Sequence, residues 1–184
     1  MYRLGILGFC AALVIAAWGP FLFPIADDLE FVNWDPDWRS LFTVPLEFWR
    51  SWGGCYTAIF LRVAYSWATR FELFWLTPVV FLIIHISGGL LAFRVLGVKP
   101  ISMAFVFGVL WTLCYFATMP SPASTVFWAT GMVVYEPGNV LSLLFTVLAL
   151  AEPVSKRVKV VNAVAIWCLT PVVVGTHFPH ALWT

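Results

Sequence analysis

Acidic, aromatic and imidazole side chains gather in three short segments of this 184-residue chain. The first segment holds Asp27, Asp28 and Glu30, the second covers residues 127–136, and the third covers residues 177–180. Carboxylates, aromatic rings and imidazoles that meet on one face are the groups from which catalytic and binding sites are built. We therefore ask which elements of the chain can bring the three segments together.

The candidate site residues outside the first segment are two arginines, two histidines and a group around a Trp-Ala-Thr-Gly sequence. They are Arg50, Arg62, Trp128, Gly131, Tyr135, Glu136, His177 and His180. Each has a purely structural alternative: a solvated loop for the carboxylates, an interfacial belt for the aromatic residues, and a snorkelling anchor for the arginines. A divalent metal held by the two histidines with Asp27 and Asp28 is a weaker interpretation, because His-x-x-His alone is weak evidence for a metal. The sequence otherwise predicts no cofactor.

The composition is that of a membrane protein. Hydrophobic residues make up 62% of the chain, charged residues make up 10%, and the mean hydropathy is +0.93. A soluble domain carries roughly 25% charged residues, so a water-exposed surface cannot be built from this sequence. No basic patch indicates nucleic-acid binding. The four cysteines have neither metal-ligand spacing nor a paired pattern.

Five apolar runs approach or exceed the length of about 20 residues that a membrane-spanning helix needs. They cover residues 4–25, 73–96, 101–119, 134–152 and 160–176. Between the first two runs, residues 26–72 are predicted to form an outer loop with interfacial helices. A sixth span through residues 51–72 is the alternative, although Arg62 and Arg70 make that segment polar.

The solvent decides the fold class, since backbone groups in lipid must be paired within the protein and these runs are too long and uniformly apolar for barrel strands. The sequence predicts an all-α, polytopic transmembrane helix bundle that forms one domain over residues 1–184. Small residues, among them Gly88, Gly89 and Gly108, are expected to let helices approach closely. His85, deep in the second run, is expected to be packed or hydrogen-bonded inside the bundle.

Charge indicates the orientation. With the amino terminus inside and five spans, the cytoplasmic turns hold six of the ten basic residues: Arg3, Arg94, Lys99, Lys156, Arg157 and Lys159. Only Glu152 of the nine acidic residues falls on that side. This distribution follows the positive-inside rule and puts all three candidate segments on the outer face.

The order of these features resembles that of polytopic GT-C-type glycosyltransferases, in particular bacterial enzymes related to the glucosyltransferases that decorate surface polysaccharides. The resemblance rests on the acidic pair after the first span, the Trp-rich loop that follows, and Phe127-Trp128-Ala129-Thr130-Gly131 with Tyr135 four residues on. It covers most of the chain as a series of weak motifs.

The resemblance implies transfer of a sugar from a polyprenyl-phosphate carrier to a polysaccharide or glycolipid acceptor at the outer face of a bacterial inner membrane. Asp27 or Asp28 would take the proton from the acceptor hydroxyl. Arginines on this face, Arg50 and Arg62 among them, would meet the lipid phosphate. Trp128 and Tyr135 would stack on a sugar ring or line the lipid entrance.

Two features depart from the family. Many relatives have a Gly-Arg pair where this chain has Gly53-Gly54-Cys55, and they usually run to several hundred residues. The second departure leaves three alternatives: a fragment of such an enzyme, a truncated reading frame or a reduced relative. The competing class is a non-catalytic membrane protein, such as a lipid-carrier flippase component, a transporter subunit or a scaffold.

Overall fold

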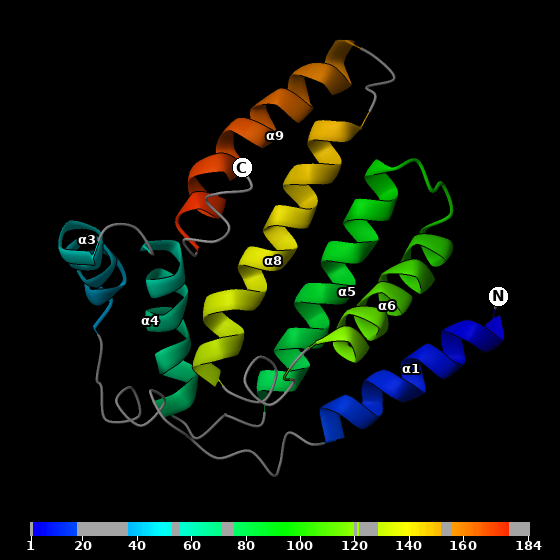
Figure 1. Ribbon diagram of the computed structural model, residues 1–184, viewed down its shortest axis with the longest axis horizontal. Helices are drawn as coiled ribbons and strands as arrows, with labels where there is room; N and C mark the ends of the chain where they lie inside the picture. Colours follow the sequence, from blue (N-terminus) through cyan, green and yellow to red (C-terminus); the bar gives the residue numbers. More distant parts are fainter. Residues whose placement is uncertain are drawn as a thin grey trace.

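The computed structural model describes residues 2–17, 37–52, 56–70, 76–119, 121, 129–151 and 156–176. Every regular element in those ranges is a helix. The helices are α1 (Tyr2–Ala17), α3 (Ser40–Trp52), α4 (Tyr56–Arg70), α5 (Thr77–Val95), α6 (Ile101–Thr118), α8 (Ala129–Leu150) and α9 (Lys156–Val174). The prediction of an all-α chain is thus confirmed for the described residues (Figure 1).

Three of these helices, α5, α6 and α8, are long and apolar enough to cross a membrane. Their apolar stretches of 18 to 20 residues measure roughly 27–30 Å at about 1.5 Å per residue. This length matches the hydrocarbon core of a bilayer, which is about 30 Å thick. The predicted run at 4–25 overlaps α1, which has 16 residues. The run at 160–176 overlaps α9, whose apolar part covers Val158–Val174 and is shorter than those of α5, α6 and α8.

The outward surface of the bundle is apolar. Trp167 on α9 is 83% exposed, and Ile83 on α5 and Ile101 on α6 are also exposed. Soluble monomers rarely present apolar surface on this scale, because its contact with water is unfavourable. Together with the three long helices, this surface indicates a membrane protein. The apolar side chains around the outside of the helix bundle would contact lipid.

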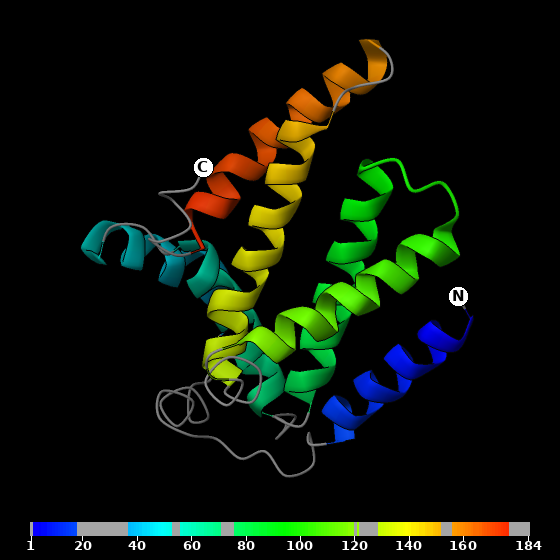
Figure 2. The same cartoon turned by 45° about the vertical axis from the view of Figure 1, so that its right-hand side comes forward.

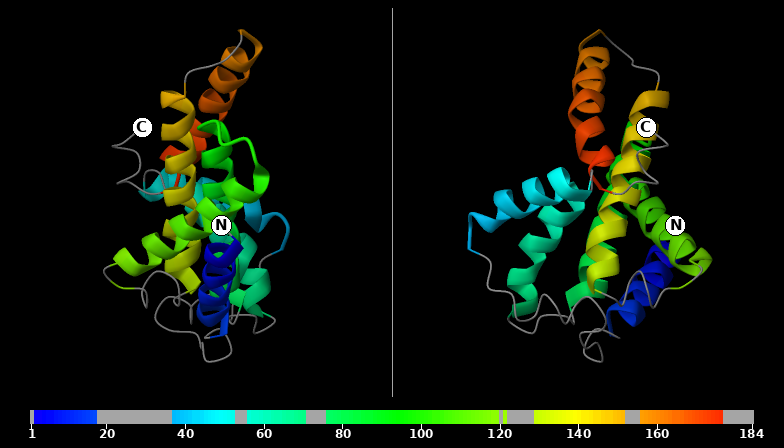
Figure 3. Two further views of the ribbon diagram at one scale, coloured as in Figure 1. Left: turned by 90° about the vertical axis from the view of Figure 1, so that its right-hand side faces the viewer. Right: turned by 60° about the vertical axis from the view of Figure 1, so that its left-hand side comes forward.

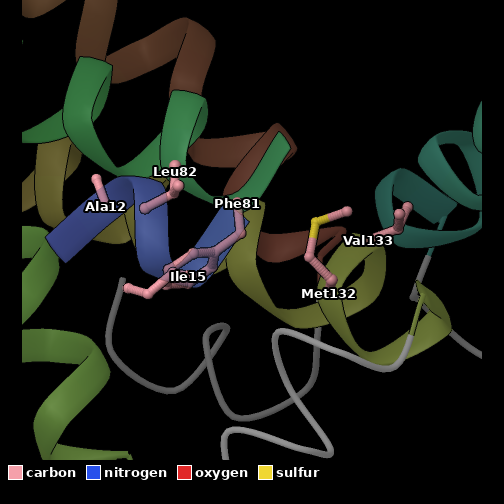
Figure 4. Packing of buried hydrophobic residues seen from close by; sticks show 6 residues of the cluster. All are labelled: Ala12, Ile15, Phe81, Leu82, Met132 and Val133. Carbon is pink, nitrogen blue, oxygen red and sulfur yellow. The ribbon is translucent and has the colours of Figure 1, made fainter. Parts of the chain in front are cut away.

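Helix α5 lies at the centre of the bundle. It packs against α8 on one side and against α6 and α1 on the other, as Figure 1 and Figure 2 show. The ends of α1 and α6 and the beginnings of α5 and α8 lie at the same end of the bundle. A small core there joins α1, α5 and α8 (Figure 4); it consists of Ala12, Ile15, Phe81, Leu82, Met132 and Val133.

Glycines allow the close helix contacts that the sequence predicts. A Cβ atom on Gly108 of α6 would lie 2.7 Å from the carbonyl oxygen of Ile86 in α5, and one on Gly89 would lie 2.8 Å from the Cα of Gly108. A Cβ atom on Gly88 would overlap the side chain of Val140 in α8. Any larger residue at these positions would therefore push the helices apart.

The segment predicted as interfacial contains two helices, α3 and α4, that pack against each other. Helix α4 also packs along α8, and its beginning meets the end of α9 (Figure 3). There the N–H of Thr57 donates to the carbonyl oxygen of Gly175 at 2.8 Å, and the Tyr56 hydroxyl donates to the carbonyl oxygen of Pro171. With 15 residues, α4 is about 22 Å long, shorter than a bilayer core.

Candidate functional site

Six of the predicted site residues lie outside the described part of the chain. They are Asp27, Asp28, Glu30, Trp128, His177 and His180. Their roles therefore remain predictions. Within the described residues, no group of three or more His, Cys, Asp or Glu side chains is placed to hold a metal ion.

The other predicted site residues occupy three helices. Arg50 is exposed in the last turn of α3, whereas the side chain of Arg62, in the middle of α4, is only 1% exposed. Gly131, Tyr135 and Glu136 lie in the first two turns of α8, which begins at residue 129 rather than near 134. Burial makes Arg62 part of the helix packing, while Arg50 is accessible from outside.

Glu136 forms a buried pair with His85. The Nε2 atom of His85 lies 2.8 Å from Oε2 of Glu136, and each residue is 1% exposed. His85 is the ninth of the 19 residues of α5, about 12 Å from the start of that helix. The expectation that His85 is hydrogen-bonded inside the bundle is confirmed. Ionisable residues at this depth are costly unless paired, and they often mark functional sites.

Aromatic rings and an amide complete the surroundings of the buried pair. The imidazole of His85 packs between the rings of Phe81 and Tyr115, with centroids 4.4 and 4.6 Å away. The Tyr115 hydroxyl accepts a hydrogen bond from Nδ2 of Asn139 at 2.7 Å. The resulting network links α5, α6 and α8, the three helices long enough to span a membrane.

One side of this network borders a cavity of about 310 Å³. We call it the polar cavity because polar side chains lie among its lining residues: His85, Asn139, Ser142 and Thr146. The cavity lies between α6, which contributes Trp111 and Tyr115, and α8, with His85 of α5 also in its lining. Three buried polar atoms in this lining have no hydrogen-bond partner among the described residues: Nδ1 of His85, Nε1 of Trp111 and Oγ of Ser142. The cavity thus combines apolar walls with a few unused hydrogen-bonding groups, which is typical of small-molecule sites.

A larger, apolar groove of about 640 Å³ lies between α3 and α4 on one side and α5 and α8 on the other. Its lining is almost entirely apolar and includes Phe42, Phe60, Leu91 and Leu144. Phe42 and Leu91 are exposed, so the groove reaches the outer surface of the bundle. Val140 of α8 borders both the apolar groove and the polar cavity.

No family model, no curated protein and no solved structure matches the chain. The likeness to glycosyltransferases therefore rests on the sequence motifs. The structure adds the geometry of the apolar groove and the polar cavity.

His85 and Glu136 are recognised from the sequence, but their partners Tyr115 and Asn139 are not. Glu136-Pro137-Gly138-Asn139 has the composition of a loop, which hides its place inside a helix. A signal was present, because Glu136, Asn139, Ser142 and Thr146 recur at helical spacing in an otherwise apolar run. That spacing predicts one polar face along α8, and three of these four residues line the polar cavity.

Proposed function

We propose that this chain is a membrane transferase, or the amino-terminal part of one, that moves a sugar from a polyprenyl-phosphate carrier to a polysaccharide or glycolipid acceptor. In this proposal α1 and α9 also cross the bilayer, which gives five spans with the amino terminus in the cytoplasm of a bacterium. The transfer takes place at the outer face of the plasma membrane, where Asp27 or Asp28 accepts the proton of the acceptor hydroxyl.

The observation that carries the proposal is the apolar groove. Its walls offer almost no hydrogen-bonding groups to a ligand, and its opening lies on the lipid-facing surface. An isoprenoid chain has no polar atoms and reaches such a groove from within the bilayer. Because lipid is as apolar as the groove, the hydrophobic effect contributes little, and the fit of the chain to the walls decides the affinity.

The position of charged residues is consistent with a phosphate at the head of that chain. Arg50 lies exposed in the last turn of α3, a helix that borders the groove, whereas Arg62 of α4 is buried in the helix packing. Guanidinium groups bind phosphate through paired, charge-assisted hydrogen bonds. In this proposal Arg50 takes the place of the Gly-Arg pair that the sequence lacks.

The proposal is tested by sugar transfer from radiolabelled polyprenyl-phosphate sugars in membranes that contain this chain. Transfer is expected in the wild type and should disappear in Asp27→Asn or Asp28→Asn at matched expression. Ser87→Phe, which fills the groove, should lower transfer, whereas Ile83→Phe, one turn away on the exposed face of α5, should not. Absence of transfer from every donor would contradict a complete transferase, and the same assay on the full reading frame would then test the amino-terminal part. Equal transfer in all four variants would contradict the proposal.

The buried pair supports a second candidate, a transporter subunit or a flippase component. Paired ionisable residues within spanning helices often mark the routes of protons and ions. Purified protein in liposomes would distinguish the two functions, since a transporter would move protons or lipid carrier across the bilayer without transferring sugar. Such movement should depend on His85 and Glu136.

A further inference from the structure

The polar side of the bundle contains hydrogen-bonding groups that its own network does not use. Among the described residues, Nδ1 of His85, Nε1 of Trp111 and Oγ of Ser142 have no partner, although all three are buried. A buried polar group without a partner is destabilising, because it has given up its hydrogen bonds to water and gained none in return. Three of them around one cavity indicate that something else satisfies them.

The protonation of Nδ1 follows from the buried pair. In the low dielectric of the bilayer, a pair without net charge is favoured over one with a net charge. One such state joins an imidazolium to a carboxylate, and the other joins a neutral imidazole to a carboxylic acid that donates to Nε2. Nδ1 carries a proton in both states. In either of these two net-neutral states, Nδ1 of His85, a residue of the cavity lining, is a hydrogen-bond donor.

The remaining groups define what the cavity can recognise. Trp111 Nε1 is always a donor, and the Ser142 hydroxyl can donate or accept. The indole ring of Trp111 is stacked on the phenol ring of Tyr115, with centroids 6.1 Å apart, which gives a flat aromatic wall. Because the buried pair has no net charge, the cavity offers no compensation for a charged ligand.

We infer that the polar cavity binds a lipid-soluble molecule whose small, uncharged head carries carbonyl or hydroxyl oxygens. Those oxygens accept hydrogen bonds from His85 Nδ1 and Trp111 Nε1 and engage Ser142. A volume of about 310 Å³ equals that of about ten water molecules at roughly 30 Å³ each, so it has room for a ring-sized head. Thr146, an exposed residue of the lining, marks the side from which the ligand enters.

The test is equilibrium binding of two tritiated probes to the whole chain in nanodiscs. One probe is a quinone with a decyl tail, which offers carbonyl oxygens, and the other is farnesol, which offers a hydroxyl. Farnesene, an isoprenoid without oxygen, serves as the competitor that should not displace either probe. Saturable binding of at least one probe is expected. The probe that binds shows whether the cavity recognises a carbonyl oxygen or a hydroxyl oxygen.

Two variants remove one hydrogen-bonding group each. Ser142→Ala and Trp111→Phe should weaken binding about two- to tenfold, the range for loss of one hydrogen bond. Thermal stability without ligand should not fall in Ser142→Ala, because the deleted hydroxyl has no partner within the described chain. Trp111→Phe also reduces the ring that stacks on Tyr115, so its stability is expected to fall and only its binding is compared. The matched controls are Ser87→Ala in the apolar groove and Trp167→Phe on the exposed face of α9.

The two readouts keep the inference falsifiable. A purely structural role predicts lower thermal stability in Ser142→Ala and, in both variants, no effect specific to oxygen-bearing probes. The inference is overturned if neither probe shows saturable binding, if farnesene competes equally well, or if the cavity variants bind like the controls. It does not depend on glycosyl transfer, since binding is measured without a sugar donor.

Discussion

The apolar groove and the polar cavity flank the same helix contact and both have largely apolar walls, but different polar side chains lie in their linings. Gly88 of α5 and Val140 of α8 meet at this contact; Gly88 lines the groove, and Val140 borders both hollows. The groove is walled by aliphatic and aromatic side chains. The cavity is lined by His85 of the buried pair and by the other two residues with an unused polar atom, Trp111 and Ser142.

The difference comes from the two faces of one helix. Along α8, Pro137, Leu141 and Leu144 border the groove at spacings of four and three residues. Asn139, Ser142 and Thr146 border the cavity at spacings of three and four. Since residues at these spacings share a face of a helix, the sequence of α8 assigns apolar chemistry to one side and polar chemistry to the other. Because different faces of α8 line the groove and the cavity, the two are suited to different ligands.

The largest expected effect comes from breaking the buried pair on the polar side. Glu136→Leu leaves His85 without its partner, and loss of one member of a buried pair typically costs about 3–5 kcal/mol. The double variant His85→Leu with Glu136→Leu should recover much of this loss, because no polar group then remains unpaired. The free energy of unfolding in detergent micelles would be measured for the single and the double variant. A double variant no more stable than Glu136→Leu would show that the pair is not the source of the effect.

The contact that separates the two hollows gives the next largest effect. Gly88→Ala places a methyl group against the side chain of Val140, and overpacking of this kind costs typically 1–3 kcal/mol. Val140→Ala makes room for that methyl group, so the double variant should be more stable than the sum of the two single changes predicts. Strict additivity of the unfolding free energies would mean that α5 and α8 are not in contact there.

Much of the fold is predictable because its signals are local. Apolar runs at 73–96 and 101–119 predict α5 and α6 closely, and the glycines that permit helix contact were recognised by their small size. The beginning of α8 was placed too late, because Glu136-Pro137 has the composition of a loop. Proline is tolerated in such a helix because neighbouring groups satisfy the carbonyl oxygen that it leaves unpaired.

The candidate site is less predictable, since its contacts join distant positions. His85 and Glu136 are 51 residues apart, and no spacing rule connects them. The packing of α4 along α8 likewise depends on tertiary contacts that cannot be predicted from the sequence alone. The sequence identified the residue types, and the helix packing decided which of them meet.

The smallest effect concerns the beginning of α3, away from both hollows. The pKa of Asp37 lies below its usual value of 3.8, chiefly because Oδ1 accepts hydrogen bonds from the hydroxyl and the N–H of Ser40. A depressed pKa stabilises the folded state above pH 3.8, and this contribution disappears as the pH falls through the lowered value. Ser40→Ala should raise the pKa of Asp37 toward 3.8 in an NMR titration. An unchanged pKa would exclude the hydroxyl as the cause.

The central claim, that the apolar groove holds the lipid chain of a polyprenyl-phosphate donor, is tested most directly by photocrosslinking. The photoreactive residue p-benzoylphenylalanine would replace Phe60 in the groove or, separately, Leu143 in the polar cavity. Tritiated polyprenyl phosphate should label the chain from position 60 and not from position 143. Labelling from position 143 alone, or equal labelling from both positions, would contradict the claim.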